Sequence, residues 1–186
     1  MTMFLEYLRG WLLTLWLRHI CHCKVGKGLR CQAFPHWYRR PKGNFNIGDH
    51  CSMGRNLYFL LRRKGKIEVG SHVGLGGNAV WGVNAGVTVG NHVMFAHFYS
   101  IRDADHGMAS DVPMDEQKMD CAPVSIGDDC WVGDGARILK GAHIPNGCVI
   151  AANAVILGKL SMESGKVYGG VPAKLISYRK SSSHPV

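Results

Sequence analysis

Aliphatic residues recur every six positions through the C-terminal half of the chain. The series consists of Ile126, Val132, Ile138, Ile144, Ile150 and Ile156. A small residue follows each of the first five by four positions, and these are Cys130, Ala136, Ala142, Cys148 and Ala154. Helices repeat at about 3.6 residues and strands at about 2, so neither alone produces a strict interval of six. A chain that turns a corner every six residues does, with one aliphatic side chain of each short strand pointing into a prism-shaped interior.

A related cassette extends this pattern upstream: an aliphatic residue, Gly, two polar residues and then Val or Cys. Its copies begin at Ile47, Val69, Val89 and Ile126, with a looser copy at Ile144 and a degenerate first copy at Val25-Gly26. The step from 126 to 144 is 18 residues, or three hexads, which is one triangular coil. The three earlier steps are 22, 20 and 37 residues and exceed one coil by 4, 2 and 19. The coils are therefore uniform except at three insertions, the largest between about Ile101 and Val124.

These patterns predict an all-β fold, a left-handed parallel β-helix of hexapeptide repeats with an N-terminal helix and a long active-site loop. We expect an N-terminal amphipathic helical segment over residues 1–24. The β-helix then covers residues 25–165, with its loop at 102–123, and residues 166–186 form a C-terminal cap and tail. The open ends of such a prism need caps, which the two terminal segments supply, and the final residues 181–186 are expected to fray.

The N-terminal segment is rich in Leu and Trp, but Glu6 and Arg9 interrupt it early. It is too short and too charged for a membrane span or a signal peptide. Two interpretations stay open for the helix. It packs on the main body or on a neighbouring subunit, or residues 1–20 make a peripheral membrane contact with Trp11 and Trp16 at the interface.

The net charge of +9 favours an anionic partner. Zinc-finger, helix-turn-helix and RNA-binding aromatic patterns are missing from the sequence, so no nucleic-acid partner is expected. Two basic clusters, at residues 39–42 and 62–66, are either solvated surface or contacts for anionic lipid or for the phosphates of a lipid-linked or nucleotide-linked sugar. The seven cysteines show no disulfide framework, which indicates a cytoplasmic protein. If residues 1–20 contact a membrane, the protein is expected at the inner face of the cell membrane.

His106 lies just where the regular coil gives way to the largest insertion. Loops on a rigid repeat scaffold tend to carry function. An unperturbed imidazole titrates near a pKa of about 6.5, so its neutral form is available as a general base at cytoplasmic pH. The alternative is a surface histidine without a role.

Three motifs flank this loop: Asp105-His106 with Ala122-Pro123-Val124, Cys130-Trp131-Val132-Gly133, and Gly169-Gly170-Val171-Pro172-Ala173-Lys174. Over roughly residues 67–179 the chain resembles the hexapeptide acetyltransferases, including galactoside, maltose, nodulation, xenobiotic and polysaccharide O-acetyltransferases. The resemblance implies acetyl-CoA as co-substrate, a sugar or glycan acceptor, and a homotrimer with active sites between subunits. It implies no metal.

The resemblance also implies roles for the acceptor side of the site. His106 would be the catalytic base, with no covalent acyl-enzyme. In the family, an asparagine that binds the acceptor precedes the catalytic histidine by one coil. Asn84 matches this place, and Asn78 is the weaker alternative. Either could instead be a corner residue in a left-handed conformation. Asp103 or Asp105 would orient the imidazole and contact the acceptor, or would merely solvate the loop.

For acetyl-CoA, the resemblance places Trp131 on the channel between subunits, where trimer packing is a compatible interpretation. The backbone of Ala151 and Ala152 would hydrogen-bond the pantetheine arm. Lys159 would lie near the pyrophosphate. Lys174 and Arg179 would meet the 3′-phosphate, unless they belong to a solvated basic tail.

Two rivals to this class remain. The first is a zinc enzyme similar to the γ-class carbonic anhydrases, with His92, His97 and His72 as ligands. The second is a non-catalytic hexapeptide subunit that acts as a scaffold. Within the favoured class, O-acetylation of a surface polysaccharide of the O-antigen or capsule type, or of its precursor, ranks above N-acetylation of a nucleotide-linked amino sugar. An antibiotic or simple sugar ranks third.

Overall fold

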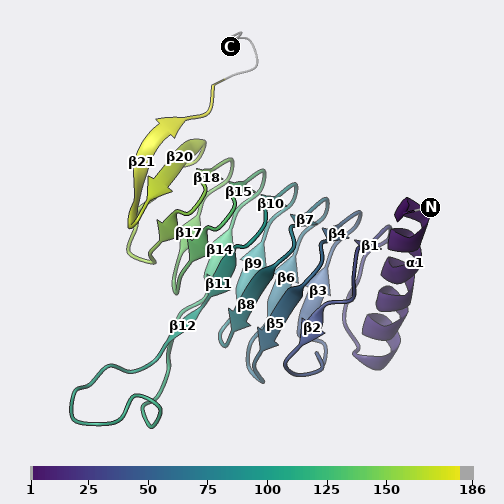
Figure 1. The fold of residues 1–186 in the computed structure, drawn as a ribbon, viewed down its shortest axis with the longest axis horizontal. Coiled ribbons are helices and arrows are strands. Elements are labelled where there is room, and N and C mark those ends of the chain that lie inside the picture. The colour runs from purple at the N-terminus through teal and green to yellow at the C-terminus, as the bar shows by residue number, and fades with distance from the viewer. Residues whose placement is uncertain (1, 181–186) are drawn as a thin grey trace.

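The computed structural model describes residues 2–180, which form an N-terminal helix followed by stacked triangular coils of short strands (Figure 1). The helical part comprises α1 (Thr2–Leu15) and the π-helical turn η1 (Trp16–Ile20). Three faces of the prism are the three large sheets, which we call faces A, B and C. Face A contains β3 (Phe45–Ile47), β6 (Ile67–Val69), β9 (Val87–Val89), β14 (Val124–Ile126) and β17 (His143–Ile144).

Faces B and C continue the same coils, and a small hairpin projects from them. Face B contains β1 (Arg30–Cys31), β4 (Ser52–Met53), β7 (Gly74–Leu75), β10 (Met94–Phe95), β15 (Trp131–Val132), β18 (Val149–Ile150), β20 (Lys166–Gly170) and β21 (Ala173–Tyr178). Face C contains β2 (His36–Trp37), β5 (Leu57–Leu61), β8 (Ala79–Val83), β11 (Ser100–Arg102), β16 (Arg137–Ile138) and β19 (Val155–Ile156). The hairpin pairs β12 (Ala104–Asp105) with β13 (Asp120–Cys121).

Within the faces, each strand pairs in parallel with the strand one coil away, except for the antiparallel pair of β20 and β21. Ile126 lies beside Ile144, Val132 beside Ile150, and Ile138 beside Ile156. All six aliphatic residues of the predicted ladder are buried, as are the five small residues that follow them. The prediction of a left-handed parallel β-helix of hexapeptide repeats is confirmed.

The first coils fill their interior with aromatic rings instead of small residues. Phe59 packs edge-on against Trp81 with ring centroids 5.7 Å apart, and both rings are fully buried. Trp81 donates its indole N–H to the hydroxyl of Tyr99 at 3.1 Å. This bond satisfies the two polar atoms that the large rings bring into the core. Burial raises the pKa of the Tyr99 hydroxyl, so it stays a neutral donor and acceptor.

Two of the three corners are tight and hold non-glycine residues in the left-handed conformation. The corner between faces A and B has positive φ angles at His50, His72, His92 and Asp129. The corner between faces B and C has them at Asn56, Asn78, Phe98 and Asn153. The third corner, between faces C and A, receives every insertion, and it carries the candidate functional site.

The helix caps the open end of the first coil. Gly10, Leu13 and Leu17 are its buried residues, and a Cβ at Gly10 would lie 1.9 Å from the carbonyl oxygen of Leu29, so the close approach of α1 to β1 requires glycine. The Arg18 Nε–H donates to the carbonyl of Val25 at 2.9 Å. The expectation that the helix packs on the main body therefore matches the structure.

The opposite side of α1 is exposed and apolar. It presents Met3, Phe4, Leu5, Tyr7, Leu8, Trp11 and Leu12. Neither helix in residues 2–180 is long and apolar enough to cross a membrane. At the other end, β20 extends face B and β21 forms its edge, while the predicted frayed tail at 181–186 lies outside the described residues.

Candidate functional site

All insertions leave the β-helix at the corner between faces C and A, on successive coils. They occupy residues 38–44 after β2, 62–66 after β5, 84–86 after β8 and 103–123 after β11. Parallel pairing holds each beside the next, because Tyr38 N–H donates to the Phe59 carbonyl at 3.0 Å and Arg62 N–H to the Val83 carbonyl at 2.8 Å. We call this line of insertions the variable edge. Side chains from four consecutive coils can therefore act on one bound molecule.

Asp103 is fully buried at the point where the largest insertion begins. Its carboxylate accepts the backbone N–H groups of Asn84 at 2.8 Å, Ala85 at 2.8 Å and Gly86 at 2.7 Å. The expected contact of Asp103 with the acceptor or the imidazole is therefore replaced by a structural one. A buried carboxylate needs such donors, and here it fixes the turn of the preceding coil.

His106 follows β12 immediately, and its side chain is exposed. Within residues 2–180 its ring takes part in no hydrogen bond and no ion pair. Asp105, the other candidate to orient it, instead forms an ion pair with Lys140, with 3.0 Å between Oδ2 and Nζ. The general-base role of His106 stays a prediction, with an imidazole free to meet a substrate.

Lys140 anchors the base of the long loop, and the sequence analysis missed it. Its ammonium contacts Asp105 on β12 and Asp120 on β13, from the turn after β16. Hydrogen bonds to Asp120 and then Asp105 raise the pKa of Lys140. No periodic signal could have revealed this group, because the contacts cross from the loop to the next coil.

The loop beyond the hairpin stands away from the coils (Figure 1). Gln117 holds its tip together, because its amide oxygen accepts the N–H of Ala109 at 2.9 Å and its amide nitrogen donates to the carbonyls of Ala109 and Val112. The loop exposes Met108, Val112, Met114 and Met119. A projecting loop with this much apolar surface is suited to contact another surface.

Asn84 and Asn78 have different environments. Asn78 has a φ of +56° and accepts a hydrogen bond from the side chain of Asn56 at 2.9 Å, so it is a corner residue. Asn84 does not have a positive φ, is half-buried, and lies on the variable edge one coil before Asp103. Of the two asparagines, Asn84 is the one placed beside the loop of His106.

The residues expected to bind acetyl-CoA fall into separate groups. Trp131 is 50% exposed on face B, level with Met94 and Val149 on the neighbouring strands. The N–H of Ala151 is already used, because it donates to the carbonyl of Tyr168 at 2.8 Å. The N–H of Ala152 makes no hydrogen bond within residues 2–180, so only it remains for the predicted contact with pantetheine.

Lys159 lines a hollow of about 270 Å³ with the Pro-Ala motif. The lining residues are Leu157, Lys159, Leu160, Pro172 and Ala173. Lys174 is exposed on β21 nearby in sequence. Arg179 lies elsewhere, since its guanidinium bonds the carboxylate of Asp129 at 2.8 Å at the corner between faces A and B. The Arg179 guanidinium is thus already engaged by Asp129 and Gly147, and the contact of Lys174 and Arg179 with the 3′-phosphate stays a prediction.

The histidines of the zinc hypothesis are corner and surface residues. His72 and His92 have positive φ angles and stack with ring centroids 4.7 Å apart. His97 faces Asp134 at 3.8 Å. In the part of the chain that the structure describes, no group of three or more His, Cys, Asp or Glu side chains is arranged to hold a metal ion.

Comparisons with known sequences agree with the ladder. Residues 123–158 match the family described as bacterial transferase hexapeptide (six repeats). Rv3034c of Mycobacterium tuberculosis, named as an acetyltransferase, is 35% identical over 97 residues, which is 52% of this chain and 32% of that protein. WbbJ of Escherichia coli K12, whose name describes a lipopolysaccharide biosynthesis O-acetyl transferase, is 36% identical over 98 residues, or 48% of this chain and 49% of that protein. The matches therefore span half or less of these relatives.

A solved structure shares the fold over most of the chain. It is AntD, an N-acyltransferase from Bacillus cereus in complex with dTDP and 3-hydroxybutyryl-CoA, with a TM-score of 0.72 and 19% identity. The alignment covers 90% of this chain and 88% of AntD. The chain is a hexapeptide-repeat β-helix protein whose relatives include acetyltransferases.

Proposed function

We propose that this protein is an acetyl-CoA-dependent O-acetyltransferase that acts on a sugar of a surface polysaccharide or of its precursor. The observation that carries the proposal is the exposed imidazole of His106, which has no partner among residues 2–180 and lies at the base of the projecting loop on the same edge as Asn84. The named activities of WbbJ and Rv3034c support the reaction class. The lipopolysaccharide role in the name of WbbJ supports the acceptor class.

The proposed chemistry is direct acetyl transfer assisted by His106. The imidazole takes the proton of an acceptor hydroxyl as its oxygen attacks the thioester carbonyl. A C–O bond forms, the C–S bond breaks, and the imidazolium returns its proton to the sulfur of CoA. Asn84, held by the turn that Asp103 fixes, would position the acceptor or stabilise the oxyanion.

Acetyl-CoA would bind along the later coils. The hollow beside Lys159 and the exposed indole of Trp131 are the two features that support this placement. AntD binds an acyl-CoA on the same fold. Lys159 would pair with a phosphate group of the co-substrate, and Lys174 would extend that contact.

We also propose a homotrimer with its sites between subunits. The exposed apolar side chains of the projecting loop, and those of Leu175, Ile176 and Tyr178 on the edge strand β21, would be covered in it. The exposed apolar side of α1 would make a peripheral contact with the inner face of the cell membrane. Sedimentation equilibrium and vesicle flotation measure these two properties separately.

N-acetylation of a nucleotide-linked amino sugar is the second candidate. Other AntD structures contain dTDP-4-amino-4,6-dideoxyglucose and CoA, with a TM-score of 0.69 and 20% identity for one of them. An amine acceptor would need the same general base. The two candidates differ in the acceptor and in the atom, oxygen or nitrogen, that attacks the thioester.

The test is a screen for acetyl-CoA consumption against sugar nucleotides and glycans, with His106→Ala beside the wild type. We expect at least one acceptor to be turned over, and His106→Ala to lower the rate about 100-fold or more, the scale of a lost general base. His143→Ala, an exposed histidine on face A, is the matched control. Wild-type turnover by His106→Ala would reject the assignment. The product's mass would count the acetyl groups, and its lability to mild base would separate O- from N-acetylation.

A further inference from the structure

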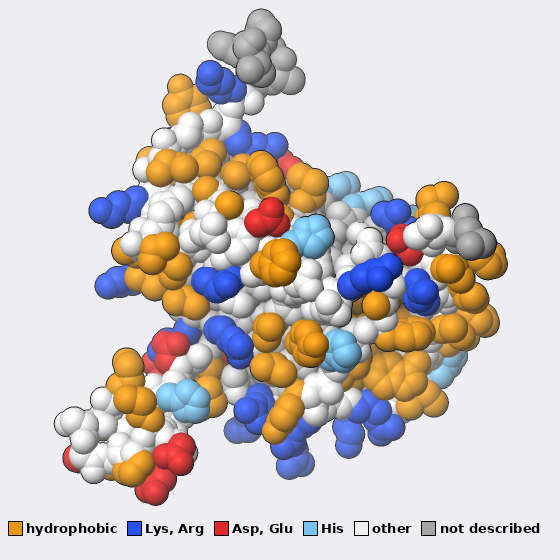
Figure 2. Space-filling model, viewed as in Figure 1, with side chains coloured by type: hydrophobic (Ala, Val, Ile, Leu, Met, Phe, Trp, Pro, Cys, Tyr) orange, Lys and Arg blue, Asp and Glu red, His pale blue; other side chains and the backbone are white. Residues whose placement is uncertain are grey.

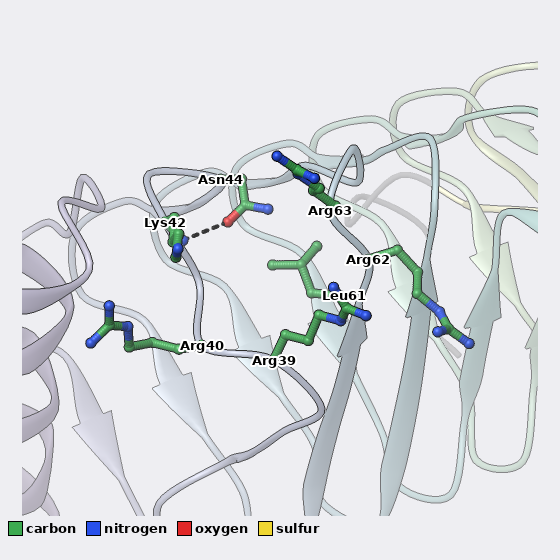
Figure 3. A pocket seen from close by; sticks show the side chains of 7 residues that line it. All are labelled: Arg39, Arg40, Lys42, Asn44, Leu61, Arg62 and Arg63. Atoms are coloured by element: carbon green, nitrogen blue, oxygen red, sulfur yellow. Dashed lines mark hydrogen bonds between the residues drawn. The ribbon is translucent and has the colours of Figure 1, made fainter.

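The two basic clusters of the sequence form one pocket at the start of the variable edge. It has a volume of about 490 Å³ and is lined by Arg39, Arg40, Lys42, Asn44, Leu61, Arg62 and Arg63. We call it the basic pocket. Figure 3 shows these side chains around Leu61, with Arg63 and Asn44 on one side and Arg39 on the other. Figure 2 shows Lys and Arg gathered on the lower edge beneath β2 and β5.

The pocket is built by contacts between its two insertions. The side-chain amide of Asn44 donates to the carbonyl of Gly65 at 2.8 Å and accepts the backbone N–H of Lys42 at 2.9 Å. The ring of Tyr38 faces Arg62 with 4.8 Å between the guanidinium carbon and the ring centroid. Leu61 is a buried residue of this lining. These contacts tie the two insertions together and hold the guanidinium of Arg62 against the ring of Tyr38.

The charge of the basic pocket is uncompensated. Five of its seven lining residues are cationic and none is acidic. The ion pairs found in residues 2–180 use Lys66, His97, Lys140 and Arg179, and none of the five. Five cations that line one pocket repel one another, and a bound multivalent anion would reduce this repulsion.

We propose that the basic pocket binds a phosphate or diphosphate group through which the acceptor sugar is linked to its carrier. Guanidinium groups match phosphate oxygens with paired, charge-assisted hydrogen bonds. The volume lies in the usual range for small-ligand sites of about 300–1,000 Å³. This inference rests on the proposed function and narrows its acceptor to a phosphate-linked sugar.

The position of the basic pocket relative to His106 supports the binding of the phosphate and the sugar of one acceptor molecule at the two places. Arg62 lies one coil before Asn84, and Asn84 lies one coil before Asp103, which is three residues from His106. Neighbouring coils are separated by about 4.8 Å, so roughly 10 Å of edge separates the backbone of Arg62 from the start of the loop. A sugar diphosphate laid along the edge would place its phosphates among the arginines and its sugar near the imidazole.

The first test measures binding of inorganic pyrophosphate to the full chain by isothermal titration calorimetry at low salt. Arg63→Gln is the pocket variant, because within residues 2–180 its side chain makes no hydrogen bond or ion pair whose loss would disturb folding. Arg55→Gln, exposed at another corner, is the charge-matched control. We expect wild type and Arg55→Gln to bind equally and Arg63→Gln to bind about tenfold more weakly.

Lys42→Met is a second pocket variant with the same expected loss, and thermal unfolding checks that all variants fold. An absence of pyrophosphate binding, or equal binding by Arg63→Gln and Arg55→Gln, would overturn the proposal. Binding only to vesicles containing phosphatidylglycerol, and not to pyrophosphate, would overturn it in favour of a bilayer contact. His106→Ala should bind pyrophosphate like wild type, so a failed acetyltransferase assignment is distinguishable from a failed pocket.

The second test separates the carriers. Acetyl transfer is measured to one sugar in three forms: free, linked to a nucleoside diphosphate, and linked to a polyprenyl diphosphate in detergent. Arg63→Gln should raise KM about tenfold for a diphosphate-linked form while leaving kcat unchanged. The form affected identifies the carrier. An equal change for the free sugar would contradict phosphate recognition.

Discussion

Removal of the Asp103 carboxylate should loosen the turn of the preceding coil and, through it, the variable edge. Both oxygens of Asp103 are engaged, one with the N–H of Asn84 at 2.8 Å and the other with those of Ala85 and Gly86 at 2.8 and 2.7 Å. The side-chain amide of Asn84 adds a longer contact of 3.4 Å. Since Asp103 is fully buried, no solvent reaches its carboxylate in the folded protein.

The size of the effect follows from the number of donors left without an acceptor. Asp103→Asn keeps one oxygen and turns an NH₂ group toward the amide of Asn84, so it should lower the free energy of unfolding by about 1.5–3 kcal/mol, as for one hydrogen bond to a charged group. Asp103→Ala leaves three amides unpaired. Each unpaired amide costs about 1–3 kcal/mol, and less where water reaches the half-buried turn. The free energy of unfolding should therefore fall by about 3–5 kcal/mol.

The assay is urea unfolding followed by tryptophan fluorescence at one protein concentration, together with hydrogen exchange of the Asn84–Gly86 segment. Asp111→Asn, an exposed aspartate of the projecting loop, is the control and should match wild type within about 0.5 kcal/mol. Faster exchange confined to residues 84–86 and the start of the loop is expected in Asp103→Asn. An unfolding free energy and an exchange pattern equal to wild type would refute the structural role of Asp103.

Three further perturbations test other parts of the fold. Lys140→Met should lower acetyl transfer about tenfold by freeing the loop, while leaving the unfolding free energy close to that of the wild type because the ion pairs are near the surface; an unchanged rate would contradict the anchoring role. Gly10→Ala should lower Tm despite the better helix propensity of alanine, because its Cβ would meet the carbonyl oxygen of Leu29; a raised Tm would contradict the close docking of α1. Ellman's reagent at pH 8 should titrate one fast thiol, Cys121, because the other six cysteines are buried and burial raises the pKa of Cys130 to about 11; a fast thiol in Cys121→Ser would contradict this.

The sequence predicted the later coils well because their strands are short. Each short strand places one aliphatic side chain in the interior, and the corner that follows places one small side chain there. One strand and one corner together take six residues, which produces the interval of six. The earlier coils hid the pattern because β5 and β8 are five residues long. On β5 the buried residues alternate at Leu57, Phe59 and Leu61, so the local period is two and the interior is filled by rings.

The candidate site was predicted only as a set of loops. His106 was identified because it lies in the largest insertion, which can be counted along the sequence, whereas Asn84 was identified through the resemblance to the hexapeptide acetyltransferases. The buried, structural role of Asp103 could not be predicted from spacing, because it depends on three backbone N–H groups of the previous coil that donate to its carboxylate. One usable signal existed, since Asn84 and Asp103 are 19 residues apart, close to the 18 of one coil.

The variable edge explains how one scaffold can carry several binding functions. The other two corners hold a left-handed residue in most coils, such as His72 and Asn78, and an insertion there would break the turn on which the next strand depends. In residues 2–180 the insertions occur at the corner between faces C and A, so those on successive coils lie beside one another. Arg62, Asn84 and Asp103 then lie on consecutive coils about 4.8 Å apart, and His106 follows Asp103 by three residues. Lengthening one insertion would change the surface at that step while leaving the buried ladder unaltered, so under the proposed function this edge is where acceptor specificity would vary independently of the fold.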